Sequence, residues 1–145
     1  MQPVLFDTSI YIMLLRSKKD APLRLREMAE GAPVWLSAVV LEELYAGAGA
    51  KGRNIVERLE NDFDRVKRVL VPNRSDWAQT GKALARLAAK YDYEQTGRGR
   101  LTNDTLIATS AGRLGISVIT TNARDFAKLA EFVLFEWRVE HTGSL

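Results

Sequence analysis

The sequence predicts an α/β fold, a three-layer α/β/α sandwich built around a central parallel sheet. Short runs of β-branched and aliphatic residues alternate along the chain with longer segments of helical periodicity. The segments between the expected strands are too long for hairpins, so the strands should pair in parallel through right-handed crossovers. In such sheets ligands bind outside the carboxyl ends of the strands, and functional residues are therefore expected there.

Two periodicities locate the elements. Strands are expected at short apolar runs, at residues 3–6, 34–36, 66–71, 116–120 and 132–135. Helices are expected where apolar residues recur every three or four positions or where a capping residue occurs, at residues 8–17, 21–30, 38–47, 52–65, 75–91 and 102–114. The 145 residues contain no repeat and no linker-like stretch, so one domain is predicted over residues 1–145.

Local signals in the first half of the chain support these boundaries. Ser37 follows the second expected strand and can cap a helix that begins at Ala38. In the next helix Ile55, Leu59 and Phe63 recur at intervals of four and therefore mark one face. Each of these helices begins shortly after the preceding element, as expected for compact crossovers.

Signals in the second half are of the same kind. The segment 96–100 (TGRGR) predicts a glycine-containing loop, and Thr102 is expected to cap the helix that follows. Asn122 can cap a short helix through Phe126 and Leu129. The helix before the loop has an apolar stripe made of Ala83, Leu84, Leu87 and Ala88.

Composition restricts the chemistry. The chain has no cysteine, which excludes disulfides, zinc–thiolate sites and iron–sulfur clusters. Its single histidine, His141, lies four residues from the end of the sequence, so a multi-histidine metal site is excluded. Acid–base or metal chemistry must therefore use carboxylates, lysines, tyrosines or hydroxyls. The net charge of +3 favours anionic partners.

No feature of the sequence predicts a membrane protein. No apolar run approaches the roughly 20 residues needed to span a bilayer. The N-terminus lacks a basic region followed by a long apolar stretch, so no signal peptide is predicted. A cytoplasmic protein without membrane association is the expectation.

Two carboxylates fall where the sheet should place its ligand site. Asp7 directly follows the first strand, although it could instead be the N-cap of the helix that begins near Thr8. Glu43 lies in an apolar stripe of its helix, where a lone carboxylate is costly to bury without a cation. Alternatively, that stripe faces solvent. Glu42 has a setting nearly as apolar, so periodicity alone does not choose between the two glutamates.

Further polar side chains complete the set. Asp104 begins an apolar helix face just after Thr102, although an acid in a first turn could simply complement the helix dipole. Asn122 follows the strand at 116–120, and Asp125 comes three residues later. Several carboxylates in one crevice would repel one another without a cation, and Mg²⁺ or Mn²⁺ prefers such oxygen ligands. Metal sites of this type activate water for phosphodiester cleavage.

Four stretches of the sequence resemble the PIN-domain family: LFDTSIYI, LEELYAG, LTNDTLIATSA and VITTNARDF. They follow one another in the order of the family, and the likeness extends over nearly the whole chain. Within that family the chain is most similar to the VapC-type toxins of bacterial toxin–antitoxin pairs. The family's first and third acids fall on Asp7 and Asp104. Its glutamate is followed by an aliphatic residue with a glycine nearby, which selects Glu43 over Glu42. The hydroxyl positions that follow the first acid in the family fall on Thr8 and Ser9.

The fourth acidic position departs from the pattern of the family. Many relatives carry an aspartate where this chain has Asn122, and asparagine is tolerated there. Asp125 could supply the missing charge through water. Arg98 and Arg100, six and four residues before the third acid, are candidates for binding RNA, together with the hydroxyls of Thr8 and Ser9.

The resemblance implies a Mg²⁺-dependent endoribonuclease, with Mn²⁺ as a substitute, that is held inactive by a cognate VapB-like antitoxin and forms a homodimer. It assigns metal binding to Asp7, Glu43 and Asp104, and catalysis to these three with Asn122 and Asp125. The main alternative is a degenerate PIN domain that binds RNA or protein without cleavage. A DNA-directed hydrolase is disfavoured, because this chain lacks the extra segments that grip duplex DNA. A phosphatase with an aspartate nucleophile is disfavoured, because Ser9 replaces the acid it needs.

Overall fold

The computed structural model describes the backbone of residues 1–17, 20–92 and 95–141, and the side chains of these residues except 95–98 and 100. Its strands are β1 (Val4–Phe6), β2 (Val34–Ser37), β3 (Val69–Leu70), β4 (Ser117–Thr120) and β5 (Trp137–Val139). Its helices are α1 (Thr8–Arg16), α2 (Ala21–Ala29), α3 (Ala38–Gly47), α4 (Ala50–Arg65), α5 (Arg74–Tyr91), α6 (Gln95–Leu114) and α7 (Ala123–Leu129).

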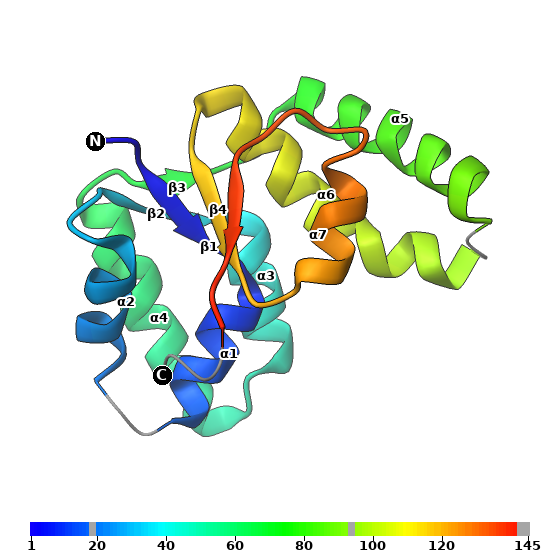
Figure 1. Ribbon diagram of the computed structural model, residues 1–145. Helices are drawn as coiled ribbons and strands as arrows, with labels where there is room; N and C mark the ends of the chain where they lie inside the picture. The colour runs from blue at the N-terminus through cyan, green and yellow to red at the C-terminus, as the bar shows by residue number, and fades with distance from the viewer. Residues whose placement is uncertain (18–19, 93–94, 142–145) are drawn as a thin grey trace.

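The five strands form one parallel sheet in the order β3-β2-β1-β4-β5 (Figure 1). β1 lies at the centre, with Val4 opposite Val34 of β2 and Leu5 opposite Val118 of β4. The strands on either side, β3 and β5, also pair in parallel with their neighbours. The predicted α/β/α sandwich is therefore confirmed, and the residue that follows β1 emerges at the middle of the carboxyl edge.

Helices cover both sides of this sheet. Figure 1 shows α1, α2 and α4 gathered on one side of the strands and α5, α6 and α7 on the other. α3 contacts members of both groups, because it packs against α1, α4 and α6. α5 and α6 lie side by side and are joined by an ion pair in which the Arg113 guanidinium donates to the buried Asp76 carboxylate at 2.9 Å. This pair holds α6 in place relative to α5.

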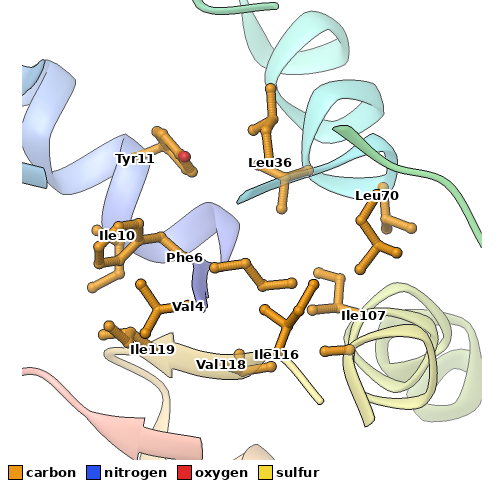
Figure 2. Packing of buried hydrophobic residues seen from close by; sticks show 14 of the residues in the cluster. Val4, Phe6, Ile10, Tyr11, Leu36, Leu70, Ile107, Ile116, Val118 and Ile119 are labelled. Atoms are coloured by element: carbon orange, nitrogen blue, oxygen red, sulfur yellow. The ribbon is translucent and has the colours of Figure 1, made fainter. Parts of the chain in front are cut away.

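The core fills the space between the sheet and the helices. Figure 2 shows side chains of β1 and β4, including Phe6 and Val118, packed against Ile10 of α1 and Ile107 of α6. Phe6 and Ile107 are fully buried. Burial of this kind fixes the ends of the central strands, because interiors are packed as tightly as molecular crystals. None of the described helices is long and apolar enough to cross a membrane.

Most predicted helix boundaries are confirmed within one or two residues, and the caps explain why. Ser37 caps α3 as predicted, because its hydroxyl accepts a hydrogen bond from the backbone N–H of Val39 at 3.1 Å. α5 begins one residue before the expected Ser75. Its cap is Asn73, which exchanges hydrogen bonds with Asp76 in a capping box.

The predicted loop at residues 96–100 is wrong. α6 runs continuously from Gln95 to Leu114, so Thr102 lies inside the helix and does not cap it. Glycines weaken an isolated helix, but tertiary packing outweighs that cost here. Leu101 is fully buried, and the Thr105 hydroxyl donates to its carbonyl oxygen at 2.7 Å.

The predicted last strand at residues 132–135 is also wrong, since β5 begins at Trp137. The backbone N–H groups of Phe132 and Val133 both donate to the carbonyl oxygen of Leu129, which extends the end of α7 into a turn. Phe135, at the end of the predicted strand, instead stacks on Trp137 of β5, with ring centroids 6.4 Å apart.

The third strand is shorter than the predicted 66–71, because only Val69 and Leu70 pair with β2. Lys67 adopts a left-handed conformation with φ of 58°, which ends α4 and delays the strand. The predicted apolar face of α4 is confirmed at Leu59 and Phe63, which pack against the core, but not at Ile55. Val56 is buried, whereas Ile55 is 52% exposed.

Candidate functional site

Asp7 emerges from the central strand and is held there by both neighbouring backbones and side chains. Its backbone N–H donates to the carbonyl oxygen of Ile119 in β4 at 3.0 Å. It occupies the N-cap position of α1, but its side chain makes no capping hydrogen bond. Instead, Oδ1 accepts from the Ser9 hydroxyl and Oδ2 accepts from the Thr120 hydroxyl, the latter at 2.6 Å. The capping alternative therefore does not explain this side chain.

The Asp7 carboxylate is buried, with only 3% of the residue exposed. Burial raises the pKa of this carboxyl, and the hydrogen bonds from Ser9 and Thr120 oppose that shift. Among the described residues no lysine or arginine forms an ion pair with it. A buried carboxylate without a cation is costly, and a bound metal ion would remove the cost.

Hydroxyl groups connect the exits of β1 and β4. The Ser9 hydroxyl oxygen accepts from the backbone N–H of Thr121 at 3.1 Å. The Thr120 hydroxyl oxygen accepts from the backbone N–H of Asn122 at 2.9 Å while it donates to Asp7. Thr120 was not predicted from the sequence, although a hydroxyl at the end of an adjacent strand is a signal that could have identified it.

Glu43 is linked to the same edge through the residue that follows Asp7. The Thr8 hydroxyl donates to Glu43 Oε1 at 2.7 Å, so α1 and α3 are joined at this point. Glu43 is half-buried, whereas Glu42 is exposed. Glu42 Oε2 instead accepts a hydrogen bond from Asn103 Nδ2 of α6 at 3.0 Å. The two glutamates that periodicity could not separate therefore contact different helices.

Asp104 lies within α6, well after its first residue, and is half-buried. The alternative that it complements a helix dipole in a first turn therefore loses its basis. The preceding residue, Asn103, contacts Glu42 of α3. The part of α6 that carries Asp104 thus lies beside the part of α3 that carries Glu43.

Asp7 follows the central strand, and Glu43 and Asp104 lie on two helices that contact each other, but the three carboxylates are not gathered around a single point. Among the residues that the structure describes, no three aspartate, glutamate or histidine side chains converge closely enough to hold a metal ion. The donor chemistry fits Mg²⁺ or Mn²⁺, because every candidate ligand is an oxygen. Asp7, Glu43 and Asp104 are thus suitable ligands that a metal would have to draw together.

Asn122 and Asp125 engage each other. Asn122 Nδ2 donates to Asp125 Oδ2 at 3.0 Å, and Asn122 Oδ1 accepts from the backbone N–H of Asp125 at 3.4 Å. Asn122 thereby caps α7, as the capping alternative predicted. The catalytic role of this pair stays a prediction. The same holds for Arg98 and Arg100, whose side chains lie outside the described residues although their backbone belongs to α6.

Comparisons with known proteins give matches of two kinds. A family model described as PIN domain matches residues 4–132. No curated protein matches the chain. The solved structures give likenesses in fold that extend over nearly the full length of both chains.

Three of these solved structures illustrate the likeness. DNA-bound VapBC from Salmonella typhimurium has a TM-score of 0.68 at 22% identity, covering 96% of this chain and 98% of that one. VapBC2 from Rickettsia felis, bound to a promoter DNA fragment, has a TM-score of 0.67 at 18% identity and covers 96% and 99%. FitAcB from Neisseria gonorrhoeae has a TM-score of 0.65 at 22% identity and covers 98% and 99%.

Proposed function

The chain belongs to the PIN-domain family, and from that premise we propose that it is a metal-dependent endoribonuclease that acts as the toxin of a toxin–antitoxin pair. One observation carries this proposal. Asp7 is buried at the carboxyl end of the central strand, where its charge meets hydroxyl groups and no cation among the described residues. Such a carboxylate is suited to binding a metal ion.

We assign the metal to Asp7, Glu43 and Asp104. Mg²⁺, or Mn²⁺ as a substitute, supplies the activation of a water molecule and the stabilisation of the leaving oxygen in phosphodiester cleavage. The protein's own residues prepare the site. Ser9 and Thr120 fix the orientation of the Asp7 carboxylate, and Thr8 fixes that of Glu43. These hydroxyls decide where each charge is presented.

RNA is the proposed substrate. The resemblance to VapC-type toxins supports this choice, and so does the positive net charge, which attracts a polyanion. Thr8 and Ser9 border the acids, and their hydroxyls are proposed to contact phosphate oxygens by turning away from Glu43 and Asp7, because each hydroxyl has one proton to donate. Arg98 and Arg100 are proposed to hold the flanking phosphates.

A VapB-like antitoxin is the proposed partner. The VapBC and FitAcB structures named above support this, because their folds match over nearly the whole chain. The simplest inhibitor is a basic side chain that reaches the acidic edge, where arginine or lysine would form charge-assisted hydrogen bonds with the carboxylates. An antitoxin that protected cells equally well after loss of every arginine and lysine in its contacting segment would contradict this mechanism. A homodimer is proposed on the resemblance alone.

The class of activity can be tested with the purified chain. Mixed RNA should be cleaved with Mg²⁺ or Mn²⁺ and left intact with a chelator, and duplex DNA of equal length should survive under both conditions. If RNA is bound but never cleaved at any metal concentration, the chain is a binding module, which is the second candidate function. Cleavage of DNA in preference to RNA would reject the proposed substrate.

The toxin role can be tested in cells. Expression of the wild-type chain should arrest growth, and co-expression of its antitoxin should restore it. Asp7→Asn keeps the size of the side chain but removes one charge from the site, so this variant should fold and bind the antitoxin without arresting growth. Growth arrest by Asp7→Asn equal to that of the wild type would separate toxicity from the acidic site.

A further inference from the structure

Two consecutive glutamates of α3 hold two different helices. Glu43 accepts from Thr8 of α1 at 2.7 Å, and Glu42 accepts from Asn103 of α6 at 3.0 Å. Successive side chains of an α-helix point about 100° apart, so neighbouring residues can reach opposite partners. α3 packs directly on both α1 and α6. It therefore connects the segments that carry Asp7 and Asp104.

The contact between Glu42 and Asn103 lies directly beside two of the acids. Glu42 precedes Glu43, and Asn103 precedes Asp104. A hydrogen bond between the first members of these pairs restrains the backbone separation of the second members. That separation matters, because the carboxylates of the described residues are not gathered closely enough to hold a metal. Because the bond already fixes the backbones of α3 and α6 relative to each other, only the side chains of Glu43 and Asp104 have to turn toward a metal, and less conformational entropy is lost on binding.

We propose that the hydrogen bond between Asn103 and Glu42 is a latch that positions Asp104 relative to Glu43 for metal binding. The inference rests on the proposed function, because it presumes that these acids bind the metal. Glu42 and Asn103 are positioning residues in this account, and neither is a ligand. Glu42 is exposed, so its bond to Asn103 contributes little to overall stability. Its effect should therefore be visible in metal affinity and almost absent from the melting temperature.

The latch is tested by measuring the affinity of the full-length, RNA-free protein for Mn²⁺ by calorimetry. Asn103→Ala breaks the bond without changing the charge, and it should weaken Mn²⁺ binding about 10-fold, the lower end of what loss of a group that orients metal ligands costs. Glu42→Ala breaks the same bond from α3. The double variant should be no weaker than the weaker single variant, because both substitutions remove one shared interaction.

Two further variants separate positioning from charge and from general packing. Glu42→Gln removes the charge but keeps an oxygen that can accept from Asn103, so it should bind Mn²⁺ more tightly than Glu42→Ala. Tyr45→Phe is the matched control, because it removes another hydrogen bond of α3, the one to Glu60 of α4 at 2.7 Å. It should leave Mn²⁺ affinity unchanged. In RNA cleavage, the Asn103→Ala variant should need more Mn²⁺ but recover its turnover when the metal is saturating.

The outcomes distinguish the latch from the site itself. Wild-type Mn²⁺ affinity in Asn103→Ala, with Asp7→Asn clearly weakened, would refute the latch and leave the proposed function standing. Additive losses in the double variant would also refute it, because the two residues would then act independently. If the wild-type chain binds no Mn²⁺, or if Asp7→Asn binds it equally well, the metal site and the latch fall together.

Discussion

In the metal-free protein, ionisation of the buried Asp7 carboxyl lowers the stability of the folded state. Burial raises the pKa of its carboxyl above the usual 3.8, and hydrogen bonds from Ser9 and Thr120 reduce that effect without cancelling it. The native state therefore holds the proton more tightly than the unfolded chain does. The contribution of Asp7 to stability is fully present below pH 3.8 and is lost as the pH rises through the raised native pKa.

Replacing this carboxyl should reverse the pH dependence that it causes. Asp7→Asn cannot ionise, so the metal-free variant should be more stable than the metal-free wild type at pH 7. The advantage should shrink as the pH falls toward 3.8, where the wild-type carboxyl is protonated. Urea unfolding in the presence of a chelator, at several pH values, measures the difference. An advantage that grows with decreasing pH would contradict the assigned pKa shift.

The sequence is enough to select the candidate acids but not the groups that orient them. Asp7 could be selected because it directly follows a strand. Thr120 could not, because its contact with Asp7 spans 113 positions and exists only once β1 and β4 are neighbours. The choice between Glu42 and Glu43 came from a family resemblance, since both lie in similarly apolar surroundings. The structure gives the physical difference, which is a separate hydrogen-bond partner for each.

The packing of helices against neighbouring segments depends on close backbone contacts that cannot be read from the sequence. Gly112 of α6 faces the segment before β5, and a Cβ built there would lie 2.3 Å from the carbonyl oxygen of Leu134. Backbone cannot yield as easily as a flexible side chain, so a larger residue must displace that segment. This contact explains the presence of a glycine in the C-terminal half of a long helix.

Gly112→Ala should therefore destabilise the protein by about 1–3 kcal/mol through overpacking. The matched control is Gly81→Ala in α5, where a new Cβ meets nothing within 4 Å and the residue is exposed. That change should stabilise by up to about 1 kcal/mol, because alanine is the better helix former. Thermal or urea unfolding of both variants measures the contrast. Equal stabilisation by the two changes would show that the approach of Leu134 imposes no restraint.

The boundary of α6 changes what the two arginines are expected to do. The predicted loop was based on two glycines, yet burial of Leu101 holds the segment in a helix. Arg98 and Arg100 are therefore carried on the same helix as Asp104. Replacing both should weaken RNA binding and flatten its salt dependence by up to roughly 1.4 in the log–log slope, since each single-strand phosphate contact accounts for roughly 0.7. Binding titrations across salt concentrations test this, and an unchanged slope would place the RNA path elsewhere.

The layered architecture of the molecule results from the alternation of strands and helices along the chain, and that alternation is visible in the sequence. Alternation predicts parallel pairing, and parallel pairing collects the strand exits at one edge. The order β3-β2-β1-β4-β5, with β1 central, is not encoded in any local run of residues. It results from which crossovers pack on which side. The last strand was misplaced because the apolar residues at 132–135 have strand-like character, whereas Phe132 lies in the turn after α7 and Phe135 packs against Phe126.

Asp7, Glu43 and Asp104 are proposed to act together as one metal site for RNA cleavage. Asp7 directly follows the central strand, and hydrogen bonds of Thr8 and Asn103 join α1 and α6 to α3, the helix that carries Glu43. Groups that act as a unit lose their function when any one is removed, and further removals cost little more. Single and combined substitutions of these three acids should therefore reduce RNA cleavage to a similar extent.

The most direct test is single-turnover cleavage of an end-labelled RNA by purified Asp7→Asn, Glu43→Gln and Asp104→Asn across a range of Mn²⁺ concentrations. Each variant should lose at least the roughly 10- to 100-fold in rate that removal of a mere supporting group costs a metal site. The triple variant should be little worse than the singles, and Tyr45→Phe should match the wild type. If any of the three single variants cleaves at near the wild-type rate, while the wild-type reaction is abolished by a chelator, the shared metal site is contradicted.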